Sequence, residues 1–379
     1  MAGILGSKSL GMNTHYKNLT EAETLLFMTP WDWPLSLFVD IVGRLKDYCQ
    51  KIVILTTPEL VTSMNISSYS NVVVETIDSP WFYLSDNTLN PLCDKYNFTG
   101  VVFWNEDVYL NDFFSSRGIP VICQDVLSCR LDRTHKDFTS MWMYRKPSWY
   151  LFNFGGFHTT SNLPRIYQQR KDTLQLDLPW LASLKDAAQG NIIYSKDEIF
   201  ERYGLDKTKR LVFVPLQVLT HLVRQDIPGF GSTFEETKCF QQWCTRVIDS
   251  SKYEVIYKRH PKAPDDEEIL EGTLTLGRDV NGFDLMNAAD YVITVSCTAG
   301  FEALCLGKKV IVLGKTYYSA ADIVYTKPPT SLEETAEFFS REHWSEDVDK
   351  FLTLIKEFTL TEEQHKDPQT YLRLFKCLP

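Results

Sequence analysis

Short apolar segments of strand type alternate with helical segments along most of this chain, and no other feature of the sequence constrains its fold as strongly. In the first half, the strand segments lie at 25–29, 51–57, 72–77, 99–106 and 120–125. Between the first two of them, apolar residues recur at helical spacing, so this region predicts a βαβ unit. Apolar strands separated by helices indicate a parallel sheet with helices on both faces.

A second series of the same kind occupies the C-terminal half. Its strand segments lie at 210–217, 253–261, 290–296 and 309–314. Between residues 134 and 190 the pattern weakens and aromatic residues crowd together. Two interpretations of this stretch stay open, ordinary packing of an irregular segment or an excursion that contacts a ligand.

The length of 379 residues suits two domains, each large enough to bury its own core. We expect an α/β fold with two doubly wound, Rossmann-like domains at 1–200 and 201–360, and a C-terminal helix at 361–379 that packs back toward the first domain. The two domains are expected to face a central cleft at the carboxyl ends of their strands, where ligands bind in doubly wound sheets.

Charge and composition exclude several classes of partner. The chain has 39 Lys and Arg against 49 Asp and Glu, a formal charge of −10, which opposes binding to nucleic acid. No apolar run is long enough to cross a bilayer, and the N-terminus lacks a signal-peptide core. The nine cysteines are scattered without a CxxC pair, which favours reduced thiols. We therefore expect a cytoplasmic protein without a transmembrane segment, for which peripheral contact with a membrane stays open.

The sequence SCTAGFEALCLGKKVIVLG, from Ser296 to Gly314, is the strongest local motif. A buried strand ends on small hydroxyl residues, including Thr298, and turns into a helix through Gly300. Backbone N–H groups at such a helix N-terminus favour a phosphate or pyrophosphate. Glu302 follows closely and is placed to accept hydrogen bonds from a ribose diol, with helix capping as the alternative.

A second motif places three cationic or potentially cationic groups at the carboxyl end of one strand. The strand YEVIYK is followed by Arg259, His260, Pro261 and Lys262. Cationic side chains at this edge suit recognition of a donor phosphate, although a single histidine is often structural.

These two motifs resemble the C-terminal domain of GT-B glycosyltransferases, and most closely the bacterial capsule-polysaccharide family that includes the Kdo transferases. The resemblance rests on PLQ at 215–217, RHPK at 259–262 and TAGFEALCLGKKV at 298–310. It spans about 100 residues, from Val212 to Gly314, and it implies transfer of a sugar from a nucleotide donor. In the Kdo enzymes the donor is CMP-Kdo, so a CMP-sugar is favoured over a UDP- or GDP-sugar as co-substrate, and no separate cofactor is expected.

The capsule enzymes usually have an acidic residue shortly after the PLQ strand, and here the sequence departs from them. His221 lies nearest that position, and the first acidic residue is Asp226, in a loop rich in Gly and Pro. Asp226 is the favoured catalytic carboxylate, and an ordinary loop aspartate is the alternative. Glu106 and Asp125, at the ends of strands in the first half, are further candidates to bind an acceptor hydroxyl or to cap helices.

Several alternatives stay open at this stage. A carboxylate can act as nucleophile with retention or as base with inversion. The only Asp-x-Asp triplet, at 347–349, lies in a helical segment, so we expect no metal requirement. A nucleotide-sugar epimerase of similar fold and a non-catalytic sugar- or nucleotide-binding subunit are the other functions considered. For the transferase, the expected partners are a nucleotide-sugar donor and a saccharide or glycolipid acceptor, in polysaccharide or glycoconjugate biosynthesis.

Overall fold

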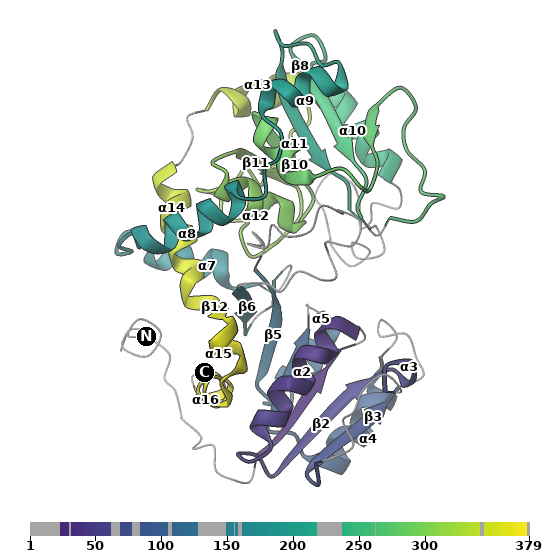
Figure 1. The fold of residues 1–379 in the computed structure, drawn as a ribbon, viewed down its shortest axis with the longest axis vertical. Coiled ribbons are helices and arrows are strands. Elements are labelled where there is room, and N and C mark those ends of the chain that lie inside the picture. Colours follow the sequence, from purple (N-terminus) through teal and green to yellow (C-terminus); the bar gives the residue numbers. More distant parts are fainter. Residues whose placement is uncertain are drawn as a thin grey trace. The chain divides into compact units, whose positions relative to one another are not determined.

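The protein is described by a computed structural model, in which the chain forms two compact units (Figure 1). Unit 1 comprises residues 1–127, 148–162 and 357–379, and unit 2 comprises residues 128–147 and 163–356. The structure describes residues 23–29, 32–61, 69–77, 84–104, 108–127, 149–154, 156–157, 161–217, 237–261, 263–341 and 345–376.

Unit 1 is built on a seven-stranded sheet with the order β12-β6-β5-β4-β1-β2-β3. Its strands are β1 (Thr24–Met28), β2 (Lys51–Thr56), β3 (Val72–Thr76), β4 (Gly100–Trp104), β5 (Val121–Val126), β6 (Trp149–Asn153) and β12 (Thr359–Thr361). The strands from β1 to β5 pair in parallel, whereas β6 pairs antiparallel with both β5 and β12. The sheet is therefore mainly parallel with an antiparallel edge.

Alternate residues of the unit 1 strands pack against helices on opposite faces of the sheet. One face, with Phe27 and Ile54, forms a core with α2 (Asp32–Leu45) and α16 (Pro368–Lys376). The intervening residues, such as Met28 and Val101, are also fully buried. The other helices of unit 1 are α3 (Pro58–Val61), α4 (Asp86–Tyr96), α5 (Val108–Ser115) and α15 (Glu362–Lys366), with a 3-10 turn η3 (Lys356–Phe358) at the boundary with unit 2.

Unit 2 has a five-stranded sheet, parallel throughout, with the order β11-β10-β7-β8-β9. Its strands are β7 (Arg210–Pro215), β8 (Tyr253–Lys258), β9 (Leu274–Leu276), β10 (Tyr291–Thr294) and β11 (Lys309–Val312). Because all five strands run in the same direction, their carboxyl ends lie at one edge of the sheet. The residues that follow these strands are brought together at that edge.

The helices of unit 2 cover both faces of its sheet. On one face, residues such as Val214, Tyr257 and Ile293 pack with α10 (Thr237–Val247) and α13 (Leu332–Ser340). The opposite face is covered by α11 (Gly282–Ala288) and α12 (Thr298–Cys305), which contact β7, β10 and β11. This arrangement is the doubly wound one that the apolar strand pattern predicted.

Residues 163–200, which the sequence analysis placed in the first domain, lie in unit 2. They form α7 (Leu163–Arg170), α8 (Leu178–Gln189) and the start of α9 (Lys196–Tyr203), and they pack with α14 (Ser345–Ile355). The indole N–H of Trp180 donates to the carbonyl of Leu352 at 2.7 Å, and the hydroxyl of Tyr167 donates to Asp347. These contacts attach α7 and α8 to a helix of unit 2.

The C-terminal segment from Glu357 lies in unit 1. Strand β12 pairs with β6, and the hydroxyl of Tyr371 on α16 donates to Gln124 at 3.0 Å. The ring of Phe375 covers Gly100, where an added Cβ would lie 2.5 Å from it. The C-terminal helix thus completes the core of unit 1.

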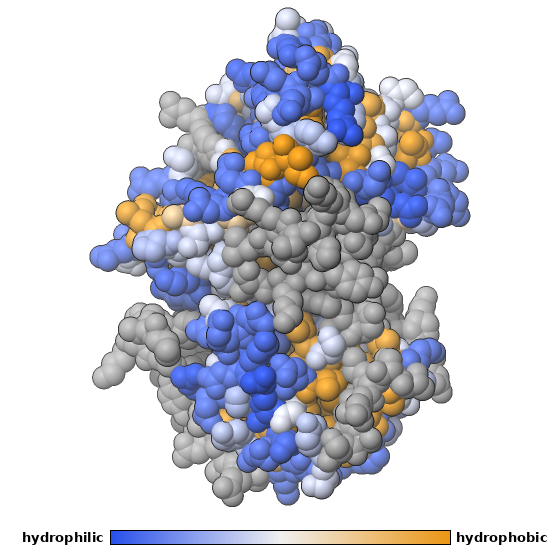
Figure 2. Space-filling model, viewed as in Figure 1, coloured by the Kyte–Doolittle hydropathy of each residue, from blue (hydrophilic) through white to orange (hydrophobic). Residues whose placement is uncertain are grey.

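The coloured surface in Figure 2 is mostly hydrophilic, with small hydrophobic areas on each unit. Apolar side chains are instead concentrated in the two cores. Within the part of the chain that the structure describes, no helix combines the length and the hydropathy needed to span a bilayer.

The expected α/β class, with two doubly wound sheets, is confirmed by the strand orders and pairings. Three strands were not expected: β6, β9 and β12. Strand β6 lies in the aromatic stretch, where Tyr150 and Phe152 are buried in the core of unit 1, so these two aromatics serve packing.

Candidate functional site

The turn between β10 and α12 lies at the carboxyl edge of the unit 2 sheet. Strand β10 ends at Thr294, and α12 begins at Thr298, with Cys297 as its N-cap residue. Cys297 makes no side-chain capping hydrogen bond, whereas an N-cap Ser, Thr or Asp commonly accepts one from the first turn. The first turn of α12 is therefore the helix N-terminus that the sequence predicted as an anion site.

Ser296 lies in this turn and is 2% exposed. Its backbone N–H donates to Oε1 of Gln217, the residue two positions after β7, at 2.9 Å. Its hydroxyl is buried and has no hydrogen-bond partner. Buried hydroxyls normally have a partner, so this oxygen distinguishes the turn from an ordinary strand-to-helix connection.

A second buried hydroxyl of the same kind follows the neighbouring strand. Thr316 comes shortly after β11, is 1% exposed, and its Oγ1 also lacks a partner. The N–H of Gly314 donates to the carbonyl of Val295 at 2.7 Å, which holds the segments after β10 and β11 side by side. Thr316 was missed by the sequence analysis, and its position shortly after an apolar strand was the available indication.

Gly300 allows α12 to pack closely on a buried tyrosine. An added Cβ at Gly300 would overlap the hydroxyl of Tyr318 and would lie 2.9 Å from Cγ2 of Thr294. The Tyr318 hydroxyl donates to the carbonyl of Cys297, which fixes the turn. Gly300 thus serves packing within the turn, and its direct contact with a nucleotide stays a prediction.

Cys297 and Glu302 influence the charge of the turn. Burial raises the pKa of the Cys297 thiol to about 11, and the nearby Glu302 carboxylate raises it further. The thiol is therefore uncharged at neutral pH and does not repel an anion. Glu302 follows the first turn of α12, which contains no acidic residue, so it lies one step further along the helix than the sequence suggested.

Arg259 is engaged within its own loop. Its Nε forms a 3.0 Å ion pair with Glu267, and the guanidinium also donates to the carbonyl of Pro264. Both charged groups are largely buried, with 20% and 7% of their side chains exposed. This arginine therefore organises the loop after β8.

His260 and Lys262 lie in the same loop. The carbonyl of His260 accepts from the N–H of Ala263 at 2.9 Å, and its side chain is half-buried. Lys262 lies outside the described residues. The predicted roles of both residues in donor binding stay predictions.

Lys258, which the sequence analysis did not single out, is the last residue of β8 and is 8% exposed. Its Nζ donates to the carbonyls of Arg259 at 3.0 Å and Arg278 at 3.3 Å. Burial lowers the pKa of Lys258 to about 8, while Asp279 and Cys297 act in the opposite direction. A lysine that ends an otherwise apolar strand was the indication in the sequence.

The proposed catalytic residues Glu106, His221 and Asp226 lie outside the described residues. Asp125 is described, and it lies within β5, opposite Leu151 of β6. In α14, Asp347 accepts from Tyr167 and Asp349 pairs with Lys185 at 2.6 Å, so both serve the packing of unit 2. Among the described residues, no group of three or more His, Cys, Asp or Glu is placed to hold a metal ion.

Known proteins resemble this chain at the level of a family and of solved structures. Residues 167–343 match the family described as capsule polysaccharide biosynthesis protein. No match is found among curated proteins.

Three solved structures illustrate the similarity of fold. The KpsC β-Kdo 2,7 transferase of Thermosulfurimonas dismutans is 16% identical, with a TM-score of 0.44, and the match covers 93% of this chain and 100% of that one. The KpsC β-Kdo 2,4 transferase of the same organism is 11% identical, with a TM-score of 0.40 and coverage of 86% and 98%. A glycosyltransferase from Rickettsia africae is 10% identical, with a TM-score of 0.38 and coverage of 94% and 98%.

The family resemblance inferred from the motifs is confirmed over residues 167–343, the segment of this chain that matches the capsule polysaccharide biosynthesis protein family.

Proposed function

We propose that this chain is a nucleotide-sugar glycosyltransferase of capsule polysaccharide or related glycoconjugate synthesis, and that the donor phosphate binds at the turn before α12. The observation that supports this most directly is the hydroxyl of Ser296, buried without a partner beside a helix N-terminus. The family match of residues 167–343 supports the same function.

The turn combines three properties that suit a phosphate. Helix N-terminal N–H groups and the helix dipole attract an anion. The buried hydroxyls of Ser296 and Thr316 offer donors to phosphate or ribose oxygens. The raised pKa of Cys297 keeps the N-cap thiol neutral, so the anion meets no opposing charge there.

The proposed reaction breaks the bond between the anomeric carbon of the donor sugar and a phosphate oxygen. The electron pair of that bond leaves with the phosphate, and an acceptor hydroxyl forms the new glycosidic bond. The proton of the acceptor passes to a carboxylate or histidine acting as base. Groups that hold the phosphate therefore also stabilise the leaving group as its charge develops.

Asp226 is our proposed catalytic carboxylate, with Glu106 and His221 as the next candidates. Asp226 is the first acidic residue after the PLQ segment at 215–217. Retention requires it to act as nucleophile, and inversion requires it to act as base. A covalent glycosyl adduct detected by intact-protein mass would support retention.

For the donor we propose CMP-Kdo or a related CMP-sugar, which the motif resemblance implies, and for the acceptor a saccharide or glycolipid. Metal-free transfer is part of the proposal, so turnover is expected to persist in EDTA. Thermal-shift measurements with CMP, UDP, GDP and their sugars identify the nucleotide class, since a ligand that binds the folded state raises its stability. Release of CMP from CMP-Kdo with and without acceptor then tests transfer.

The variant Ser296→Ala gives a sharp test of the site. It removes an unpartnered buried hydroxyl, so the stability of the free protein is expected to stay the same or rise. Nucleotide affinity is expected to fall several-fold, because a hydrogen bond to the phosphate is lost. Lower stability with unchanged affinity would show that Ser296 is structural.

The enzyme assays also separate the alternatives. Isomerisation of a nucleotide sugar without acceptor would favour an epimerase. Nucleotide binding without transfer or hydrolysis, with every acceptor tested, would favour a non-catalytic binding subunit.

A further inference from the structure

We propose that Lys258 is an additional donor-binding residue, whose buried ammonium group binds the phosphate of the nucleotide at the carboxyl edge of the unit 2 sheet. This inference rests on the proposed function, because it assigns a further residue to the same phosphate site. It is independent of the residues after β8 that the sequence motif indicated.

The register of the strands places Lys258 close to the turn before α12. Lys258 pairs with Pro215 on β7, and its carbonyl accepts from the N–H of Leu216 at 2.9 Å. The next residue, Gln217, bonds Ser296 at 2.9 Å. Lys258 and Ser296 thus lie on the two sides of the end of β7.

The alternation of side chains places Lys258 on the same face of the sheet as α12. Tyr253, Val255 and Tyr257 pack in the core under α10 and α13. Because successive side chains of a strand point to opposite faces, Lys258 lies on the α11 and α12 face. Its pKa responds to the Cys297 thiol, the N-cap of α12, which also indicates proximity.

Lys258 is a buried cation whose hydrogen bonds go to neutral groups. Its two partners are backbone carbonyls, and the ammonium group has three donors. Among the described residues it forms no ion pair within 4.0 Å. Arg259, by contrast, is already paired with Glu267. A buried unpaired cation is costly unless an anion neutralises it, and a donor phosphate supplies that anion.

The electrostatic environment predicts a measurable proton uptake on binding. Burial holds the pKa of Lys258 near 8 in the free protein, and the groups that oppose this shift are Asp279 after β9 and Cys297 before α12. The carbonyls of Arg259 and Arg278 complete its described neighbours. A bound phosphate stabilises the ammonium form, so the group gains a proton when the nucleotide binds above pH 8.

The experiment is calorimetric titration of the full chain with CMP, in buffers of different ionisation enthalpy, at pH 7.0 and pH 8.5; UDP and GDP replace CMP if the thermal-shift screen selects them. From the pKa of about 8, the wild type is expected to take up roughly 0.7 proton at pH 8.5 and about 0.1 at pH 7. Lys258→Gln keeps N–H donors for the two carbonyls and removes the charge. It is expected to abolish the uptake and to weaken binding about tenfold or more.

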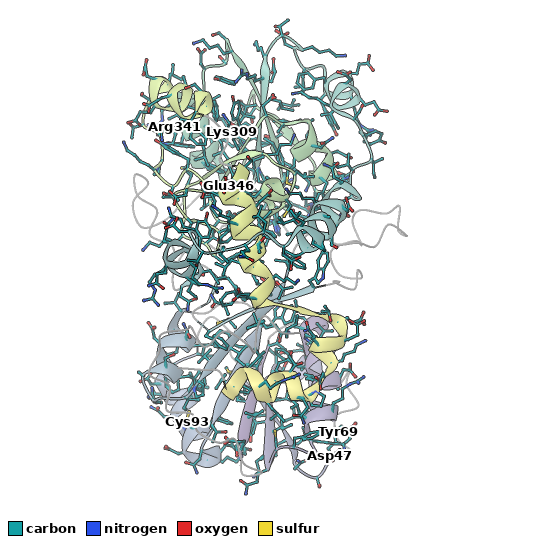
Figure 3. The ribbon with its side chains drawn as sticks, turned by 90° about the vertical axis from the view of Figure 1, so that its left-hand side faces the viewer. Asp47, Tyr69, Cys93, Lys309, Arg341 and Glu346 are labelled. Atoms are coloured by element: carbon teal, nitrogen blue, oxygen red, sulfur yellow. The ribbon has the colours of Figure 1, made fainter. Side chains whose placement is uncertain are left out.

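Lys309→Gln is the matched control. Lys309 also donates to two backbone carbonyls, those of Phe339 and Arg341, and burial also lowers its pKa (Figure 3). It begins β11, so it lies at the amino edge of the same sheet. Its replacement is expected to leave both affinity and proton uptake unchanged.

Two results would overturn the assignment of Lys258. One is a wild type that binds the nucleotide at pH 8.5 without proton uptake, a measurement that does not depend on any variant folding. The other is a folded Lys258→Gln that retains wild-type affinity and uptake. Failure of every nucleotide and nucleotide sugar to bind the wild type is a different result, and it would contradict the proposed function itself.

Discussion

At the scale of single residues, the turn before α12 depends on close contacts that tolerate little change. Gly300 lies against Tyr318 and Thr294, both of which are buried or nearly so. Its backbone does not require the left-handed conformation, so the glycine is needed for space alone.

Gly300→Ala is therefore expected to destabilise the protein by about 1 to 3 kcal/mol, since overpacking a rigid core forces neighbours to move. Tyr318→Phe removes the hydroxyl that the new methyl group would meet. The double variant is expected to be less destabilised than the sum of the two single variants. Chemical denaturation of the four proteins measures this coupling, and simple additivity would show that Tyr318 is not the obstacle.

His260 and Glu302 are expected to contribute to donor binding in different ways. His260→Ala removes a charge-assisted phosphate contact, typically about 1.5 to 3 kcal/mol, and Glu302→Gln weakens ribose recognition. Titration with nucleotide measures both effects, and unfolding curves serve as controls. Reduced stability with normal affinity would assign either residue a structural role.

Asp226 is expected to act in the chemical step. Asp226→Asn should reduce turnover by roughly a hundredfold or more and leave donor affinity nearly intact, because the lost interaction belongs to the transition state. Asp266→Asn, an exposed loop aspartate of unit 2, is the control. Turnover within a few-fold of the wild type would remove Asp226 from the mechanism and direct attention to Glu106 and His221.

At the scale of secondary-structure elements, the parallel strands were the predictable part of the fold. Each is a short apolar run, and β1, β2, β7 and β10 begin within one residue of the expected positions. Strands β9 and β12 have three residues each, too few to establish a period. Their pairing depends on partners distant in sequence, so local pattern alone could not locate them.

The candidate site shows the same division. The turn of Ser296 and the residues after β8 were predictable, because small hydroxyl and cationic residues stand out after apolar strands. The engagement of Arg259 by Glu267 was not, since the pairing depends on how the loop folds. Lys258 was missed because its burial follows from its neighbours on the sheet, and the sequence shows only a lysine at the end of a strand.

The docking of α16 on unit 1 is sensitive to the glycine beneath it. An added Cβ at Gly100 would lie 2.5 to 3.0 Å from three atoms of the Phe375 ring. Gly100→Ala is expected to destabilise unit 1 by about 1 to 3 kcal/mol and to loosen α16. Hydrogen exchange of residues 357–376 measures this effect. Phe375→Leu in the same protein is expected to restore part of the protection, and unchanged exchange in Gly100→Ala would contradict the packing argument.

At the scale of the whole molecule, the two units differ in the ionisable groups that they bury. Unit 1 buries His365 on α15, which is 2% exposed and stacks on Tyr150 at a ring distance of 4.0 Å. Its Nε2 has no hydrogen-bond partner. Burial lowers the pKa of His365 to about 4; Asp40 and Glu362 oppose this shift, and Lys366 adds to it. The folded unit 1 therefore requires a neutral imidazole.

Acid is consequently expected to destabilise unit 1 before carboxylates begin to titrate. The folded pKa of about 4 lies below the unfolded value of 6.5, so the unfolded chain binds more protons between these values. The stability is complete above pH 6.5 and falls as the pH drops toward 4, by about 2 kcal/mol between pH 7 and pH 5. Carboxylates with lowered pKa values, such as Asp177 and Asp322, act only at lower pH.

Denaturant unfolding at pH 7 and pH 5 tests this prediction, with hydrogen exchange to report unit 1 and unit 2 separately. His365→Phe keeps an aromatic ring beside Tyr150 and Tyr371 but cannot bind a proton. We expect this variant to lose most of the difference between the two pH values, and we expect unit 2 to respond little in either protein. Equal pH dependence in the wild type and in His365→Phe would show that another group controls the acid stability of unit 1.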